Sequence, residues 1–136
     1  MENRPPSVPR LRVLPVGNAG AASTALTAWL AEQEDLDVCA PAMTTAATIA
    51  LAVQFQPQVV LLDFHGLPVS TAYTIALLKE LVLPPAVFVL THDASPAMRR
   101  RCHEARADAV FDKTAELEAL RDALGRLQRA LPLAAP

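Results

Sequence analysis

The stretch QPQVVLLDFHGLP, residues 56–68, decides the fold of this chain. Pro57 stops the helical pattern that precedes it, and an apolar run of valines and leucines then closes on Asp63. A strand in a one-sided sheet alternates apolar and polar residues, whereas a strand covered by helices on both faces is apolar throughout. We therefore predict a buried parallel strand over residues 58–63 that ends in a carboxylate.

More short runs of this kind occur along the chain, at residues 11–16, 36–40, 86–91 and 108–112. Segments with helical periodicity separate them, and Pro84 marks a further stop. Hydroxyl residues that favour helix starts precede these segments, namely Ser23 or Thr24, Thr44 and Thr45, and Ser70 and Thr71. This alternation predicts an α/β fold, a doubly wound, five-stranded parallel sheet with right-handed crossovers.

The last two helical segments have the clearest patterns. The first opens with Ser95 as a hydroxyl cap and Pro96 in the first turn, where a missing N–H costs nothing. Its apolar positions are Met98, Cys102 and Ala105, which leaves the arginines at 99–101 pointing largely outward. The second has Thr114 as its predicted cap. Its apolar residues form one stripe, at Leu117, Leu120, Leu124, Leu127 and Leu131.

The chain has 136 residues, of which 52% are hydrophobic, and a formal net charge of -2. This length suits one domain with a single core, and so small a net charge attracts neither nucleic acid nor an anionic membrane. We expect the folded domain at residues 11–131, after an unstructured lead-in at 1–10 and before a tail at 132–136. The lead-in has charges and prolines but lacks the apolar core of a signal peptide.

Membrane insertion is not expected, because the longest apolar run, LVLPPAVFVL at 81–90, is too short to span a bilayer and contains two prolines. Cys39 and Cys102 are far apart and have no metal-ligand spacing, so we interpret them as reduced core thiols. These features are typical of a soluble, cytoplasmic protein.

Candidates for chemistry follow from the predicted topology. In a doubly wound sheet the functional crevice lies beyond the carboxyl ends of the strands. The polar and glycine residues at these ends are Gly17 and Asn18, Asp63, Thr91 with His92 and Asp93, and Asp112 with Lys113.

The segment at 56–68, the segment VFVLTHDASPAMRRRCHEARADAVFDKT at 87–114 and the closing amphipathic helix together resemble a bacterial response-regulator receiver domain. The resemblance covers nearly the whole chain after residue 10 and implies the flavodoxin-like (βα)5 receiver fold. In that family an Asp at the end of the third strand accepts a phosphoryl group from a histidine kinase. A Thr or Ser ends the fourth strand and a Lys the fifth. Asp63, Thr91 and Lys113 stand in these places.

The resemblance implies a role for each of the three residues. A carboxylate such as Asp63 is a nucleophile for phosphoryl transfer, because it forms an acyl phosphate that water later hydrolyses. Lys113 supplies a point charge against the phosphoryl group, and Mg²⁺ supplies the rest. The Thr91 hydroxyl donates a hydrogen bond to a phosphoryl oxygen and reports the modification.

The stretch RVLPVGNAGAAS, residues 12–23, departs from the family pattern. Two acids that hold Mg²⁺ normally end the first strand, and Gly17 and Asn18 stand in their positions. Mg²⁺ prefers hard oxygen ligands, so Asp63, a backbone carbonyl and the amide oxygen of Asn18 make a poor cage. Asp63 and Asn18 are the candidate metal ligands, and the loss of the acidic pair weakens the site.

Further departures also weaken a phosphorylation switch. Val110 stands where the family often has a Tyr or Phe, and Phe111 points to the opposite face of its strand. Thr114 replaces the common Pro after the Lys, and Pro68 lies one residue further from Asp63 than is usual. Together these changes suggest a degenerate, or atypical, receiver.

Other motifs leave alternatives open. The GNAG turn at 17–20 favours an anion but lacks the Lys of a nucleotide-binding loop. His65, His92 and Asp93 offer a transition-metal site, although loop histidines are more often surface residues. The RRR run at 99–101 has no helix-turn-helix after it, so we interpret it as a solvated face or a partner surface.

Two hypotheses about function remain. The first is a receiver domain of a two-component phosphorelay, with Asp63 as acceptor and a histidine kinase or phosphotransfer protein as partner. The second is a phosphorylation-independent protein-interaction module. An enzyme is not expected, because a hydrolase that uses Asp63 and His65 lacks a second acid for general acid or base catalysis.

We expect output to pass through binding, because the chain ends soon after the last helix. As the resemblance implies, the fourth helix, fifth strand and fifth helix form the face for homodimerisation or for a partner protein. Arg121 is expected on or near that face.

Overall fold

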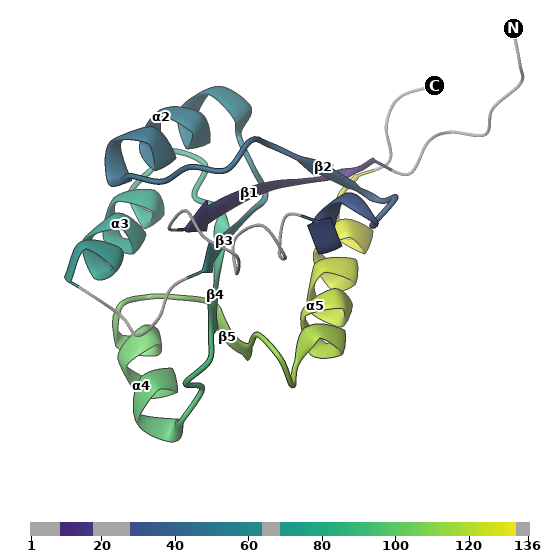
Figure 1. The fold of residues 1–136 in the computed structure, drawn as a ribbon. Helices are drawn as coiled ribbons and strands as arrows, with labels where there is room; N and C mark the ends of the chain where they lie inside the picture. The colour runs from purple at the N-terminus through teal and green to yellow at the C-terminus, as the bar shows by residue number, and fades with distance from the viewer. Residues whose placement is uncertain (1–8, 18–27, 64–68, 133–136) are drawn as a thin grey trace, which may run out of the picture.

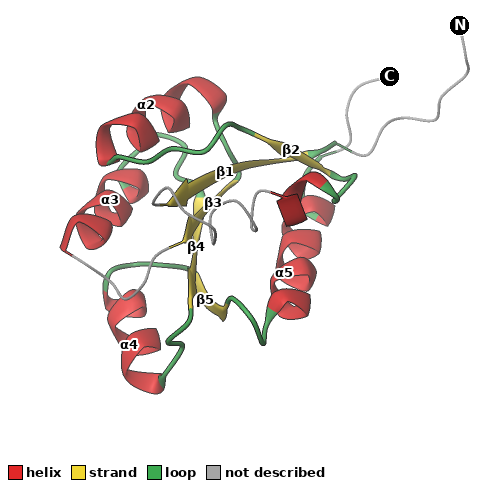
Figure 2. Ribbon diagram, viewed as in Figure 1, coloured by secondary structure: helices red, strands yellow, loops and turns green. Residues whose placement is uncertain are grey.

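The computed structural model of the chain describes residues 9–17, 28–63 and 69–132. Its strands form one parallel sheet in the order β2-β1-β3-β4-β5 (Figures 1 and 2). The strands are β1 (Leu11–Gly17), β2 (Leu36–Val38), β3 (Val59–Asp63), β4 (Ala86–Thr91) and β5 (Ala109–Asp112). The order reverses between β1 and β3, which makes this a doubly wound sheet with its switch point beside Asp63. The predicted fold class is confirmed.

Helices cover both faces of the sheet. They include α2 (Thr45–Phe55), α3 (Val69–Lys79), α4 (Pro96–Glu104) and α5 (Leu117–Arg129), and residues 28–31 are also helical. Figure 1 shows α2, α3 and α4 on one side of the sheet and α5 on the other. The packing agrees, since Ile75 and Met98 share one cluster of buried residues while Leu30 and Leu120 share the other.

The inner strands are the most deeply buried part of the fold. All five residues of β3 are buried, and so are the last five residues of β4. The edge strand β2 is only partly buried. This difference is the physical reason for the apolar runs in the sequence, because a strand with helices on both faces has no solvent side.

The strand ends differ from the predicted ones by one or two residues. β1 extends to Gly17, which pairs with Asp63 and donates its N–H to the carbonyl of Ala42 at 3.1 Å. β2 ends at Val38 rather than at residue 40, and a single parallel bridge joins Val16 to Ala42 further on. β3 and β5 each begin one residue later than predicted.

The predicted helix caps are partly confirmed. Thr44 caps α2, accepting the N–H of Ala47 at 3.0 Å, and Ser95 caps α4. Thr114 is not the cap of α5, because its hydroxyl donates to Asp112 and the helix begins after Glu116. The other predicted starts, at Ser70 and Thr71, lie inside α3, while Ser23 and Thr24 lie outside the described residues.

The last two helices bury the positions that the sequence pattern predicts. Met98 and Cys102 of α4 are buried, as are Leu120 and Leu124 of α5. Burial raises the pKa of the Cys102 thiol, against the smaller opposing effects of Arg101 and Arg99. Both cysteines are free thiols, and Cys39 is half-buried.

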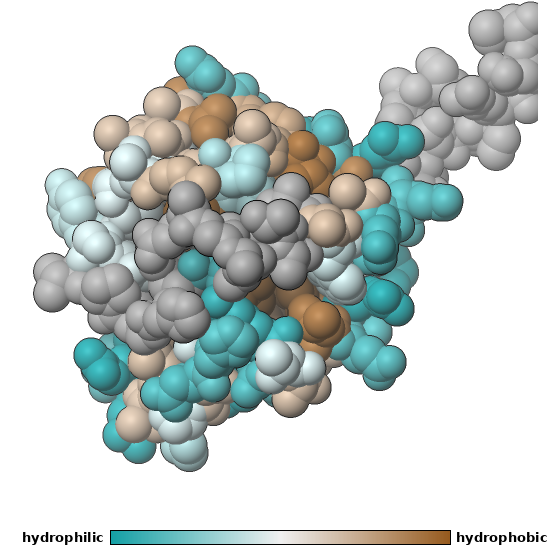
Figure 3. All heavy atoms as spheres, in the orientation of Figure 1, coloured by the Kyte–Doolittle hydropathy of each residue, from teal (hydrophilic) through white to brown (hydrophobic). Residues whose placement is uncertain are grey.

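Polar and apolar residues are interspersed over the face of the molecule that Figure 3 shows. Among the helices of the described ranges, none combines the length and the apolar character that a bilayer span requires.

Candidate functional site

Asp63 and Lys113 meet at the carboxyl edge of the sheet. Asp63 is the last residue of β3, and Lys113 directly follows β5. The ammonium Nζ of Lys113 forms an ion pair with Oδ1 of Asp63, and only 11% and 3% of the two side chains are exposed. The second carboxylate oxygen of Asp63, Oδ2, is buried and has no hydrogen-bond partner among the described residues. Among the described residues, the ion pair therefore leaves Oδ2 of Asp63 without a partner.

Thr91 ends the strand that runs between β3 and β5. It is fully buried, and its hydroxyl oxygen accepts the N–H of Asp93 at 3.0 Å. Its carbonyl accepts the N–H of Lys113 at 3.0 Å. This bond holds the backbone of Lys113, whose side chain carries the ammonium group. No described residue accepts the hydroxyl hydrogen of Thr91, which a hydroxyl can donate while its oxygen accepts.

Gly17 stands beside Asp63 in the register of β1 and β3. It brings no side chain to the site, so this position supplies no carboxylate beside Asp63. No group of three or more His, Cys, Asp or Glu side chains suited to a metal occurs in the parts of the chain that the structure describes. Lys113 already engages one oxygen of Asp63. The described residues therefore do not fit a Mg²⁺ site, which needs several hard oxygen ligands.

The turn after β5 is organised around Asp112. Its Oδ1 accepts the N–H of Thr114, the hydroxyl of Thr114 and the N–H of Ala115, at 2.8, 2.8 and 3.0 Å. The N–H of Ala115, then the N–H and the hydroxyl of Thr114, lower the pKa of Asp112 to about 2. The carboxylate thus holds the turn that presents Lys113.

Arg99 links α4 to β5 and to the start of α5. Its guanidinium donates to the carbonyls of Ala94 and Val110 and to Oε1 of Glu116, at 3.0, 2.8 and 2.6 Å. The same Glu116 oxygen accepts the N–H of Asp112, and this bond and the one from Arg99 lower the pKa of Glu116. We expected Arg99 to point largely outward, and 42% of its side chain is exposed, but its guanidinium also bonds to Val110 and Glu116. Sequence periodicity carries no signal for a contact between residues 99 and 116.

Val110 and Phe111 of β5 lie on opposite faces of the sheet, as predicted. Val110 packs against the cluster on the α2, α3 and α4 side, and Phe111 belongs to the cluster on the α5 side. The ring of Phe111 meets that of Phe88 edge-on, with 5.4 Å between the ring centroids. Phe111 is thus part of the core and does not face the side of α4.

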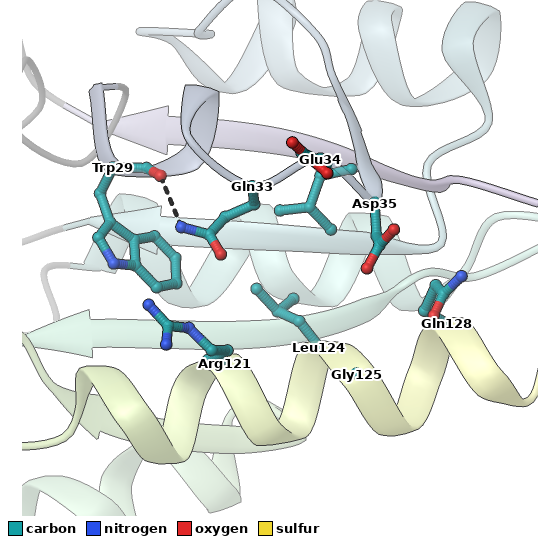
Figure 4. A pocket seen from close by; sticks show the side chains of 9 residues that line it. Trp29, Gln33, Glu34, Asp35, Arg121, Leu124, Gly125 and Gln128 are labelled. Carbon is teal, nitrogen blue, oxygen red and sulfur yellow. Dashed lines mark hydrogen bonds between the residues drawn. The ribbon is translucent and has the colours of Figure 1, made fainter.

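Arg121 lies away from the face where we expected it. Its guanidinium carbon is 5.9 Å from the ring centroid of Trp29, on the side of α5 that meets residues 28–36. Figure 4 shows the two side chains facing each other across a pocket that Gln33, Glu34 and Gln128 also line. Its position therefore gives no support to an interface through α4.

Several predicted site residues cannot be compared with the structure. Asn18, His65 and Pro68 lie outside the described residues, as does most of the GNAG turn. His92 and Asp93 are exposed at the start of the loop after β4. Their role as metal ligands, together with that of Asn18, stays a prediction.

The sheet order, the covering helices and the Asp63–Lys113 pair define a (βα)5 domain with the fold of response-regulator receivers. Solved structures of such domains are similar to this chain. The response regulator domain of CheB from Thermotoga maritima has a TM-score of 0.74 and 16% identity, covering 90% of this chain and 99% of that one. A chain from the complex of the CheA3 P1 domain with CheY6 from R. sphaeroides has a TM-score of 0.68 and 21% identity, covering 90% and 99%.

A third similar structure is the Mn²⁺-bound form of the response regulator Rcp1. It has a TM-score of 0.62 and 19% identity, and the likeness covers 92% of this chain and 99% of that one. At these identities the similarity establishes the fold. No protein-family model and no curated protein sequence matches the chain.

Proposed function

We propose that this chain is a receiver-type signalling domain of a two-component pathway and that Asp63 accepts a phosphoryl group. The observation that carries the proposal is the buried carboxylate of Asp63, with Oδ1 paired to Lys113 and Oδ2 without a hydrogen-bond partner among the described residues. A buried carboxylate with one uncommitted oxygen is a candidate nucleophile, and the adjacent ammonium offsets negative charge that arrives with the phosphoryl group.

The donor in this proposal is a phosphohistidine on a histidine kinase or phosphotransfer protein. Oδ2 of Asp63 attacks the phosphorus, an O–P bond forms and the P–N bond breaks. The electron pair of that bond returns to the imidazole nitrogen, which solvent protonates. CheY6, which shares the fold, was solved in complex with the P1 domain of CheA3. A comparable protein partner would bring the donor to the carboxyl edge of the sheet here.

Lys113 and Thr91 have distinct roles in this step. Lys113 attracts the phosphoryl oxygens as a point charge. The Thr91 hydroxyl, on the intervening strand, donates to a phosphoryl oxygen with the hydrogen that its bond from Asp93 leaves available. No step is assigned to a metal, because the described residues do not form a cage for one.

The surface of α4, β5 and α5 is the proposed output face, through which a second copy or a partner protein would bind. Its support is the guanidinium of Arg99 in α4. It donates to the carbonyl of Val110 in β5 and to Glu116, which directly precedes α5, and so connects the three elements. Arg100 and Arg101 are exposed on α4 and would favour an acidic partner surface. The two free cysteines agree with a cytoplasmic setting.

A second candidate function is a phosphorylation-independent interaction module with the receiver fold. Gly17 favours it, because the residue in register with Asp63 contributes no carboxylate for a metal. In this version the Asp63–Lys113 pair is structural, and the output face binds its partner in a single state.

Chemical mapping distinguishes the two candidates. The protein is incubated with phosphoramidate, and hydroxylamine is then used to cleave any acyl phosphate, which leaves a hydroxamate at the acceptor. The first candidate predicts one hydroxamate, at Asp63, and none in Asp63→Asn. A folded protein that yields no hydroxamate at all would support the interaction module instead.

A further inference from the structure

A cavity of about 190 Å³ lies between the first turns of α2 and α3, next to the end of β1. Val16 and Met43 contribute apolar surface to it. The other lining residues that the structure describes all carry hydroxyls, namely Thr44, Thr45, Thr48, Ser70, Thr71 and Thr74. They belong to two stretches with the same spacing, TTAAT at 44–48 and STAYT at 70–74. The cavity is therefore built from matching segments at the starts of two helices.

Most of these hydroxyls already have partners. Thr48 donates to the carbonyl of Thr44 at 2.7 Å, and Thr74 donates to that of Ser70 at 2.8 Å. The hydroxyls of Thr45 and Thr74 lie 2.6 Å apart and join the two helices. Because Thr74 gives its hydrogen to Ser70, Thr45 is the donor in that contact.

Thr71 is the exception among the buried hydroxyls of the cavity. Its residue is only 2% exposed, and its Oγ1 has no hydrogen-bond partner among the described residues. A buried hydroxyl without a partner is costly, so an acceptor atom in the cavity would relieve a real penalty.

The charges around the cavity indicate which kind of ligand could accept a hydrogen bond from Thr71. Neither α2 nor α3 has an acidic residue in its first turn, so the positive ends of both helix dipoles are not neutralised from within. The first N–H groups of each helix also lack intrahelical partners. Among the described residues that line the cavity none is charged, so none of them balances a dianion. We propose that this cavity binds a small, singly charged oxyanion such as acetate or formate. The site is distinct from Asp63 and does not depend on its phosphorylation.

The test is a titration of the ¹⁵N-labelled full chain with sodium acetate at constant ionic strength, followed by amide chemical shifts. A parallel titration uses sodium chloride alone. We expect saturable acetate-specific shifts at the amides of Thr45, Ala46, Ser70 and Thr71. Thr71→Val should weaken acetate binding about tenfold, since it removes one hydrogen bond to a charged acceptor. Thr71→Ser keeps the hydroxyl and should retain binding, which guards against a folding defect in the valine variant.

Asp63→Asn serves as the second control, and it should bind acetate as the wild type does. This separates the cavity from the phosphoryl acceptor, so that failure of one proposal leaves the other testable. Absence of saturable shifts, equal shifts with chloride, or unchanged affinity in Thr71→Val would each overturn the assignment. Tighter binding of inorganic phosphate than of acetate would show that the single-charge class is wrong.

Discussion

The ammonium of Lys113 pairs with Oδ1 of Asp63 although their strands, β5 and β3, are not neighbours, since β4 runs between them. The contact passes over the end of β4, which is Thr91. The pairing of the three strands therefore holds Asp63, Thr91 and Lys113 together at the carboxyl ends of the strands. Both paired side chains are largely buried, and a buried charge is stable only when it is compensated. The same ion pair therefore contributes to the stability of the domain and forms part of the candidate site.

Removal of the ammonium should be more harmful than removal of both charges. We expect Lys113→Met to lower the free energy of unfolding by about 3 kcal/mol, because it leaves the carboxylate of Asp63 buried and unpaired. The double variant Asp63→Asn/Lys113→Met should recover most of this loss. Urea unfolding of the wild type, both single variants and the double variant measures the coupling, and simple additivity of the two single effects would contradict it.

Restoring an acid beside Asp63 should create metal dependence. In Gly17→Asp the new carboxylate stands in register with Asp63, so we expect lower stability in EDTA from like-charge repulsion. Added Mg²⁺ should then raise its unfolding temperature by several degrees, while the wild type shifts by less than about 1 °C. Gly17→Asn is the control for bulk without charge. An equal Mg²⁺ response in the wild type would mean that it already has a cage.

Arg99 should stabilise the output face, and Arg100 should not. We expect Arg99→Ala to lower the free energy of unfolding by about 1.5 kcal/mol, a modest figure because both partners of its ion pair are partly exposed. Amide shifts should change in α4 and at the start of α5. Arg100→Ala, on the exposed side of the same helix, should stay within about 0.5 kcal/mol of the wild type. Equal effects of the two substitutions would rule out the proposed link.

The turn at Asp112 predicts a pH dependence of stability at acid pH. The pKa of Asp112 is lowered from 3.8 to about 2 in the folded protein, so the folded state favours its charged form. Its contribution is then fully present above pH 3.8 and is lost as pH falls through 2. Asp112→Asn lacks this contribution and should lose less stability over that window. Urea midpoints measured from pH 6 down to pH 2 test this, and parallel curves for the two proteins would contradict it.

Much of the fold could be predicted because buried strands are apolar in sequence and helix starts are marked by hydroxyl residues. The inner strands β1, β3 and β4 are apolar since helices cover both of their faces, and the hydroxyl caps Thr44 and Ser95 precede helices whose first N–H groups need acceptors. Asp63 and Lys113 were both expected at the functional crevice, because the carboxyl ends of parallel strands lie along one side of the sheet.

Other features depend on contacts that a local pattern cannot encode. Thr114 has the residue type of a helix cap, but the carboxylate of Asp112 captures its hydroxyl two residues earlier. Arg99 sits in a basic run that resembles a solvated face, yet it bonds to a carbonyl and a carboxylate that only the fold brings near. The hydroxyl cavity did have a signal, the repeated spacing of TTAAT and STAYT, but its meaning requires α2 and α3 to lie side by side.

The central claim is that Asp63 accepts a phosphoryl group with Lys113 as its charge partner. Intact mass after incubation with acetyl phosphate, with Mg²⁺ or with EDTA, tests this most directly in the wild type and in Asp63→Asn. We predict one phosphoryl increment in the wild type and none in the variant. No increment in the folded wild type under either condition, or an equal increment in Asp63→Asn, would contradict the claim.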